Sequence, residues 1–228
     1  AMRLEHDPIH RHKDVLTHTL AVIENVHADA NESFDFRITR LAALFHDVGK
    51  PATRGFIEGK GTTFHMHDVK GAKMTRKRLV ALRFPNEDVV AITELVRLHL
   101  RFHTYEMGWS DSAVRRYVND AGVLLNELNV LTRCDCTTRN ERKAARLSQR
   151  MDELEERIIE LAAKEELKSM RPELDGLAVM ERLGLPAGPI VGQALSFLLE
   201  IRLEEGLIGD EEIGRRLDAW WSEQSAVG

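Results

Sequence analysis

The segment 41–51 constrains the fold of this chain more than any other segment does. It begins with the apolar helical run Leu-Ala-Ala-Leu-Phe and continues with His46 and Asp47. Gly49 suits a left-handed cap at the end of a helix, and Pro51 is unsuited to continuing one. The pattern therefore predicts a helix that carries His46 and Asp47 in its last turn, where unpaired carbonyl groups favour a cation.

The rest of the sequence predicts an almost all-α protein. Leu, Ala, Glu and Arg recur at helical spacing, and aromatic residues make up only 6% of the chain. Glycines and β-branched residues in 54–64 predict a loop or a small hairpin. The predicted helices are 14–26, 36–48, 68–83, 86–102, 111–121, 123–137, 141–169, 177–183, 191–205 and 210–221.

The predicted domain boundary lies near Ser169, before the helix-breaking sequence Pro-Glu-Leu-Asp-Gly at 172–176. With 228 residues, 43% of them hydrophobic, the chain is long enough for one substantial core and an appendage. We therefore predict a metal-binding helical bundle over 1–169 and a small C-terminal helical module over 170–228.

Composition narrows the possible partners. No apolar run approaches the length needed to cross a bilayer, so no membrane partner is expected. Cys134 and Cys136 are two residues apart, which suits a reducing cytosol better than a disulfide, and a cytoplasmic protein is expected. The net charge of −5 means that any contact with nucleic acid has to use a local basic patch.

Four residues on three separate predicted helices form a candidate metal site. A single histidine on a helix is more commonly a core or surface residue, so the hypothesis depends on the whole set: His18, His46, Asp47 and Asp135. Imidazole nitrogen and carboxylate oxygen suit Mn, Ni, Fe, Co or Zn, whereas Mg is less natural with so many histidines. Such a metal would lower the pKa of a coordinated water and polarise a phosphoryl oxygen.

The order His18, His46-Asp47, Asp135 resembles the HD superfamily of metal-dependent phosphohydrolases. The chain is more similar still to the HD-containing body and tail of bacterial CCA-adding enzymes and poly(A) polymerases. The segments that carry this similarity are 11–20, 44–51, 64–72, 174–176 and 183–189. The resemblance implies an HD-domain helical bundle followed by a C-terminal helical module, with tRNA or an RNA 3′ end as partner.

The family's nucleotidyltransferase head is expected to precede this segment in the full-length protein. Such a head carries a Gly-rich turn and an Asp-x-Asp pair, and no two aspartates here are separated by one residue. We therefore expect that this chain does not add nucleotides by itself.

The resemblance also implies a role in metal binding for His67 and His99. In HD proteins with two metals, similarly placed histidines hold the second ion and the motif aspartate bridges the pair. The alternative is that His67 and His99 orient a substrate phosphate or cap the site. We therefore expect a divalent metal cofactor of one or two ions.

Charged residues near these ligands have two interpretations each. Lys50 is a candidate catalytic residue that contacts a substrate phosphate, or it is a cation stabilised by a helix end. Two basic stretches either track RNA phosphates or are solvated helix faces, and the resemblance favours RNA. Their candidate RNA-binding residues are Lys70, Lys73, Arg78, Arg139, Arg142, Lys143 and Arg146.

Two functions remain as hypotheses, beside the alternative of a metal-stabilised scaffold without catalysis. The first is a metal-dependent phosphohydrolase that acts on a phosphomonoester or phosphodiester, including a 2′,3′-cyclic phosphate at an RNA end, with Asp47 and Lys50 as catalytic residues. The second is a tRNA-binding body and tail of a CCA-adding enzyme or poly(A) polymerase whose HD site is not catalytic.

Overall fold

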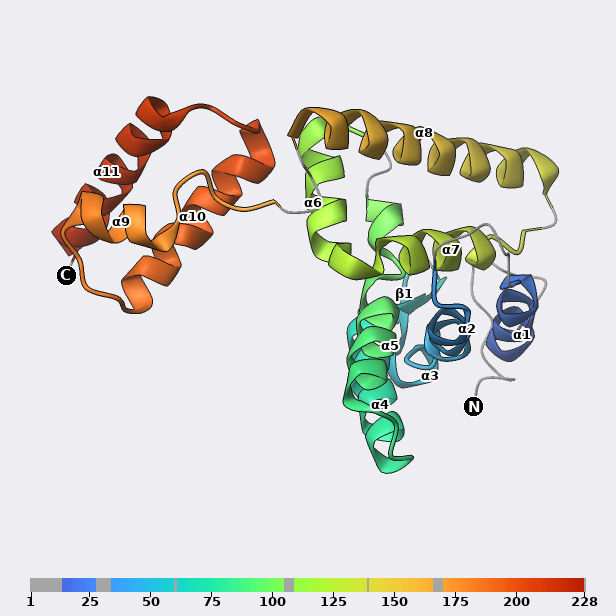
Figure 1. The fold of residues 1–228 in the computed structure, drawn as a ribbon. Helices are drawn as coiled ribbons and strands as arrows, with labels where there is room; N and C mark the ends of the chain where they lie inside the picture. The colour runs from blue at the N-terminus through green and yellow to red at the C-terminus, as the bar shows by residue number, and fades with distance from the viewer. Residues whose placement is uncertain are drawn as a thin grey trace. The chain divides into compact units, whose positions relative to one another are not determined.

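The computed structural model describes residues 14–27, 34–59, 61–104, 109–138, 140–165 and 170–227. Over these residues the predicted all-α class is confirmed, because helices are joined by short connections and the only sheet among them has two strands (Figure 1). None of the helices within these ranges is both long and apolar enough to cross a membrane. The chain divides into two compact units, described separately below.

Unit 1 comprises Ala1–Gly108 and Asp120–Glu153. Two of its helices begin with aspartate caps: Asp14 accepts from the Thr17 amide at 2.8 Å, and Asp35 from the Ile38 amide at 2.9 Å. The elements in its first segment are α1 (Val15–Asn25), α2 (Phe36–Phe45), α3 (Lys50–Thr53), β1 (Arg54–Ile57), β2 (Gly61–Phe64), α4 (His67–Ala81), α5 (Asn86–Leu98) and η2 (Arg101–Thr104). The second segment contributes η3 (Gly122–Leu124), α7 (Leu125–Asp135) and the first half of α8 (Glu141–Glu165).

The core of unit 1 forms where α5 packs against α4 and α2, and where α7 packs against α1 and α2 (Figure 1). Its fully buried aliphatic side chains recur at helical spacing, as the sequence predicts. They include Val22, Ala42, Leu79, Ile92, Leu95, Leu128 and Leu131. This packing gathers the ends of α2, α5 and α7 and the start of α4 around the candidate site.

The end of α2 differs from the prediction. The helix stops at Phe45, His46 is its cap, and Gly49 has φ −75° rather than a left-handed conformation. The backbone instead tightens into successive three-residue turns, with Val48 N donating to Phe45 O and Lys50 N to Asp47 O. As expected, Pro51 does not continue α2; it lies in the first turn of the separate short helix α3, where its missing amide proton is not needed.

Gly49 is required for a close approach rather than for its backbone angle. A Cβ at this position would lie 2.1 Å from the carbonyl oxygen of His67 and 2.7 Å from the amide nitrogen of Gly71. The turn after α2 therefore rests directly on the backbone of α4. This contact sets Asp47 and His67 side by side.

The segment 54–64 is the small hairpin that the glycines predict, with β1 and β2 antiparallel. Other differences are boundary shifts. The helix predicted over 86–102 ends at Leu98 and is followed by the short 3-10 helix η2, and the last helix extends beyond residue 221.

Unit 2 comprises Trp109–Asn119 and Leu154–Gly228. It contains most of α6 (Asp111–Ala121), the second half of α8, α9 (Gly176–Leu183), α10 (Pro189–Glu205) and α11 (Asp210–Val227). Its core is apolar and consists of Val179, Val191, Ala194, Leu198, Ile201, Ile213 and Leu217. The predicted boundary near Ser169 stays a prediction, because this residue lies outside the described ranges.

Candidate metal centre

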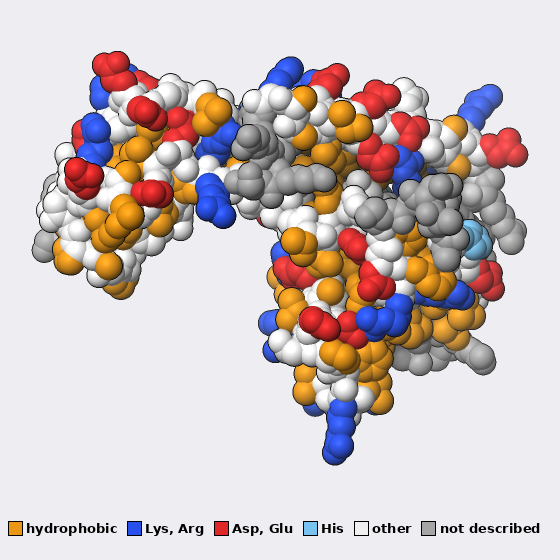
Figure 2. Space-filling model, viewed as in Figure 1, with side chains coloured by type: hydrophobic (Ala, Val, Ile, Leu, Met, Phe, Trp, Pro, Cys, Tyr) orange, Lys and Arg blue, Asp and Glu red, His pale blue; other side chains and the backbone are white. Residues whose placement is uncertain are grey.

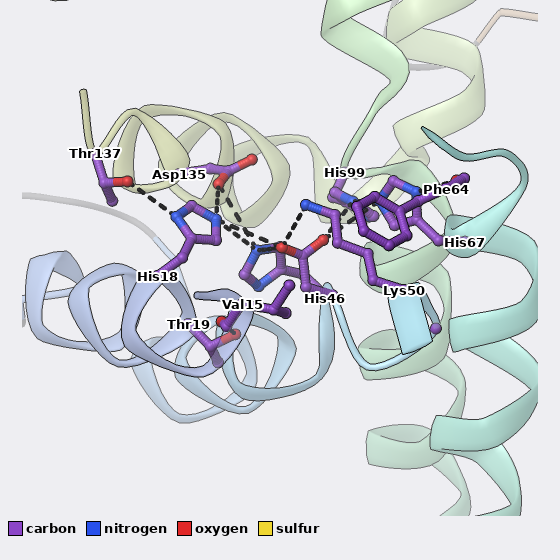
Figure 3. A network of polar contacts seen from close by, with 12 residues as sticks. Val15, His18, Thr19, His46, Lys50, Phe64, His67, His99, Asp135 and Thr137 are labelled. Carbon is purple, nitrogen blue, oxygen red and sulfur yellow. Dashed lines mark hydrogen bonds and ion pairs between the residues drawn. The ribbon is translucent and has the colours of Figure 1, made fainter. Parts of the chain in front are cut away.

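Four imidazole rings converge in unit 1, and a local hydrogen bond fixes the orientation of three of them (Figure 3). In each of these three, Nδ1 lies 2.7–2.8 Å from the carbonyl oxygen three residues earlier in the chain. A carbonyl oxygen only accepts, so Nδ1 carries the proton and Nε2 of the neutral ring presents a lone pair. The pairs are His46 with Ala43, His67 with Phe64, and His99 with Val96.

His18, the fourth ring, is oriented by a residue far away in the sequence. Its Nδ1 lies 2.9 Å from Oγ1 of Thr137, just after α7 (Figure 3). When Nδ1 donates to this hydroxyl, Nε2 of His18 also faces inward as a lone pair. All four histidines then present the same kind of ligand atom.

The inward-facing nitrogens are too close to be stable without a cation between them. Nε2 of His46 lies 3.2 Å from Nε2 of His18, and Nε2 of His99 lies 3.3 Å from Nε2 of His67. When both rings of a pair are neutral, two lone pairs at such distances repel each other, because neither nitrogen then holds a proton to donate. A proton or a metal ion resolves the conflict, and buried neutral imidazole is a preferred ligand of transition metals.

Asp47 lies between the two pairs of histidines and is almost fully buried. Its Oδ2 is 3.3 Å from Nε2 of His46 and 3.6 Å from Nε2 of His18. Its Oδ1 is 3.3 Å from Nε2 of His67 and 3.9 Å from Nε2 of His99. One carboxylate therefore faces both pairs, one oxygen to each.

Asp135 closes the side of the centre next to His18. Its Oδ1 lies 2.9 Å from Nε2 of His18 and 3.7 Å from Nε2 of His46. This oxygen is buried, and these two ring nitrogens are its close neighbours. When both rings are neutral and present lone pairs, such an oxygen is a ligand atom in need of a cation.

The six predicted ligands therefore lie together, in two groups whose ligand atoms are within 4.8 Å of one another. The first group is His18, His46 and Asp135, and the second is Asp47, His67 and His99. The sequence hypothesis placed Asp47 with the first group. The distances place one oxygen of Asp47 beside each group, Oδ2 beside His46 and His18, and Oδ1 beside His67 and His99.

The electrostatics of the centre reflect its burial and its charges. Burial lowers the pKa of His46, but the attraction of Asp47 and Asp135 outweighs it and raises the value to about 9. Burial and repulsion by His46 lower the pKa of His99 to about 4. Burial opposes ionisation of Asp47 and Asp135, yet the adjacent imidazoles hold both pKa values well below the ordinary range.

Lys50 is part of the centre rather than a solvated cation at a helix end. It is 5% exposed, and Nζ donates to Oδ2 of Asp47 at 2.8 Å. Nζ also lies 5.8 Å from the centre of the Phe64 ring (Figure 3). The ammonium group is therefore held beside the carboxylate that faces both histidine pairs.

Sequence reasoning missed two features of this centre. Thr137 was not predicted to take part, although its position two residues after Asp135 places it at the same helix end. The close approach of Gly49 to Gly71 was also missed, because the spacing of two glycines in sequence does not reveal that their backbones meet.

The candidate RNA-binding residues are on helix surfaces. On α4, Lys70, Lys73 and Arg78 are exposed; on α8, Arg142 and Arg146 are exposed and Lys143 is half-buried. Arg139 lies outside the described residues. Figure 2 shows basic and acidic side chains interspersed on the visible face rather than one basic patch.

A helical bundle with a His-Asp centre defines the class of this protein. The family profile described as HD domain matches residues 15–181, and the chain belongs to this family. Two curated relatives are more specific. The chain is 40% identical over 185 residues to the CC-adding tRNA nucleotidyltransferase of Thermus thermophilus, a match that covers 80% of this chain and 39% of that protein.

The second relative is the A-adding tRNA nucleotidyltransferase of Deinococcus radiodurans. It is 32% identical over 189 residues, which are 82% of this chain and 42% of the relative. The chain thus spans about two fifths of the length of the curated relatives it matches.

Proposed function

We propose that unit 1 is a metal-dependent phosphohydrolase that acts on phosphomonoesters or phosphodiesters. The observation that supports this most directly is the pair of Nε2–Nε2 contacts at 3.2 and 3.3 Å, with Asp47 facing both. Neutral imidazole and carboxylate ligands favour Mn, Ni, Fe, Co or Zn over Mg. His18, His46 and Asp135 would hold one ion, and Asp47, His67 and His99 a second.

Each residue has a defined part in this proposal. A bound divalent ion would lower the pKa of a coordinated water and polarise a phosphoryl oxygen. Asp47 balances positive charge on both sides of the centre. Lys50, fixed beside Asp47, can stabilise negative charge that develops on an anionic ester as it reacts.

A metal and substrate panel tests the proposal. Chelated protein would be reloaded with Mn²⁺, Ni²⁺, Co²⁺, Zn²⁺ or Mg²⁺ and assayed with a phosphomonoester, an open phosphodiester and a nucleoside 2′,3′-cyclic phosphate. Turnover with at least one transition metal supports the proposal. Absence of turnover with every metal, in protein shown by elemental analysis to be loaded, would refute it.

The two-ion arrangement has a separate test. His67→Ala or His99→Ala is expected to lower the metal content while one ion stays bound to the other group. An unchanged number of bound metal ions would instead indicate that His67 and His99 orient a substrate phosphate.

We propose tRNA or an RNA 3′ end as the partner, in the cytoplasm and as part of a longer protein with a nucleotidyltransferase head. The names of both relatives and the exposed basic residues of α4 and α8 support this. The same observations support the second candidate function, an RNA-binding body whose HD centre is not catalytic. The metal and substrate panel separates the two candidates.

Charge reversal on α8 tests the RNA proposal. Changing Arg142, Lys143 and Arg146 to Glu should weaken tRNA binding regardless of sequence and flatten its salt dependence, because phosphate contacts release counterions. Lys164→Glu, an exposed position on the same helix, is the control. If tRNA binding changes neither with salt concentration nor with the charge reversals, these side chains are only solvated and do not contact RNA.

A further inference from the structure

We propose that one face of the β1–β2 hairpin binds the nucleobase of the substrate, with Phe56 as the stacking surface. The inference builds on the proposed phosphohydrolase function and narrows its substrate class to nucleotides or RNA ends. It is based on the register of the hairpin, the exposure of Phe56 and the contact between Phe64 and Lys50.

The register determines which hairpin side chains share a face. Arg54 pairs with Phe64, and Phe56 pairs with Thr62. Side chains of directly paired residues lie on the same face, and residues two apart on one strand share that face. Phe56 therefore lies on the same face as Phe64, whereas Ile57 lies on the opposite one.

The opposite face is identified independently. A Cβ added to Gly55 would lie 3.2 Å from Oγ1 of its partner Thr63. Gly55, Thr63 and Ile57 are therefore on one side of the hairpin, and the two phenylalanines are on the other.

The shared face leads from the metal centre to solvent. At its inner end, Phe64 is 8% exposed, its ring lies beside Nζ of Lys50, and its carbonyl oxygen accepts from Nδ1 of His67. Two residue pairs further out, about 7 Å along the strands, Phe56 is 77% exposed. A substrate with its phosphate at the centre would extend toward solvent beside this ring.

The chemistry of this face favours a nucleobase. An exposed aromatic ring next to a phosphate-binding centre is the arrangement by which proteins hold single-stranded nucleotides, with the phosphate bound by charge and the base by stacking. Arg54 brings a guanidinium group to the same face, which complements an anionic ligand. Every base has a stacking surface, so Phe56 would confer preference for nucleotides without selecting a particular base.

The test compares a ligand that has a base with one that lacks it. Adenosine 2′-monophosphate and inorganic phosphate would each be titrated calorimetrically into the Mn²⁺-loaded protein. Phe56→Ala should weaken binding of the nucleotide roughly 10-fold, on the order of one stacked base, and leave phosphate binding unchanged. Phe56→Trp should retain nucleotide binding, because the stacking surface remains.

Ile57→Ala is the matched control, because Ile57 is the next residue, is 49% exposed and lies on the opposite face. The inference would be overturned if Phe56→Ala and Ile57→Ala lowered the affinity for the nucleotide equally. It would also be overturned if Phe56→Ala weakened the binding of nucleotide and of phosphate equally. Nucleotide binding to the wild-type protein no tighter than phosphate binding would also overturn it. The titration does not depend on turnover, so its failure is distinguishable from failure of the phosphohydrolase proposal.

Kinetics give a second readout where turnover is present. With adenosine 2′,3′-cyclic monophosphate, Phe56→Ala should raise KM and leave kcat nearly unchanged, because stacking holds the base equally before and during the reaction. A fall in kcat with unchanged KM would contradict a base-binding role.

Discussion

Two buried charged sites, Arg115 in unit 2 and the His-Asp centre in unit 1, differ in how completely their hydrogen bonds are satisfied. In unit 2, Arg115 is 4% exposed, and its guanidinium group donates to the carbonyl oxygens of Leu203 and Glu204 near the end of α10. In unit 1, the Nε2 atoms of neutral imidazole rings would face one another and two carboxylates with only lone pairs between them. Arg115 stabilises a helix end, whereas the centre in unit 1 is incomplete without a cation.

This contrast separates a structural buried charge from a binding site. A buried charged group whose hydrogen-bond donors all find acceptors within the protein is stable without a ligand and supports the fold. Several buried hydrogen-bond acceptors that face one another destabilise the fold unless a cation binds between them. Their presence in unit 1 therefore indicates a binding site.

The largest expected effect is loss of catalysis on removing the carboxylate shared by both groups. Asp47→Ala should lower metal-dependent hydrolysis by roughly 10³-fold, because charge stabilisation of several kcal/mol is lost. Asp152→Asn is the control, since Asp152 forms a surface ion pair with Arg133. Turnover in the Asp47→Ala protein close to that of wild type would show that the centre is not the site of reaction.

Metal removal should distinguish the two units within one sample. The chain's three tryptophans, Trp109, Trp220 and Trp221, all belong to unit 2, so their fluorescence reports on that unit alone. A metal at about 100 times its Kd stabilises its site by about 2.7 kcal/mol. Chelation should therefore lower the midpoint of the helical circular dichroism signal more than the midpoint of tryptophan fluorescence. Equal shifts would mean that the units unfold together.

A methyl group at Gly49 should disrupt unit 1 through the backbone contact with α4. Gly49→Ala is expected to cost about 1–3 kcal/mol of folding free energy and to weaken metal binding, since Asp47 and His67 are displaced from each other. Gly192→Ala in α10 is the matched control, because a Cβ there meets nothing within 4 Å and helix propensity should improve. Denaturant titrations that find Gly49→Ala as harmless as Gly192→Ala would contradict the contact.

The smallest of these effects concerns Thr137, the residue that orients His18. Thr137→Val should weaken metal binding about 10–100-fold, as expected for loss of a hydrogen bond to a ligand histidine, and should alter the visible spectrum of the Co²⁺-loaded protein. Thr137→Ser keeps the hydroxyl and should restore both properties. Failure of Ser to rescue, with Val and Ser equally impaired, would mean that Thr137 contributes only packing.

Much of the helical fold followed from the sequence, because the helical spacing of apolar residues is a local signal. The ligands could be nominated from the order of His18, His46-Asp47 and Asp135 in the chain. Which oxygen of Asp47 faces which pair of histidines could not be predicted, since it depends on the direction of the carboxylate. The role of Gly49 was predicted wrongly for a similar reason. A glycine required by a left-handed backbone and a glycine required by close contact with another segment cannot be distinguished in the sequence.

The hydrogen bonds that orient the four histidines also bear on the order of folding. His46, His67 and His99 are each oriented by a carbonyl oxygen three residues away, so their geometry is set as soon as the local turn forms. His18 depends on Thr137, 119 residues further along the chain, and closing so long a loop is slow. The His67 side of the centre is therefore available to a metal before the His18 side, and a metal ion present during refolding would meet a half-built site first.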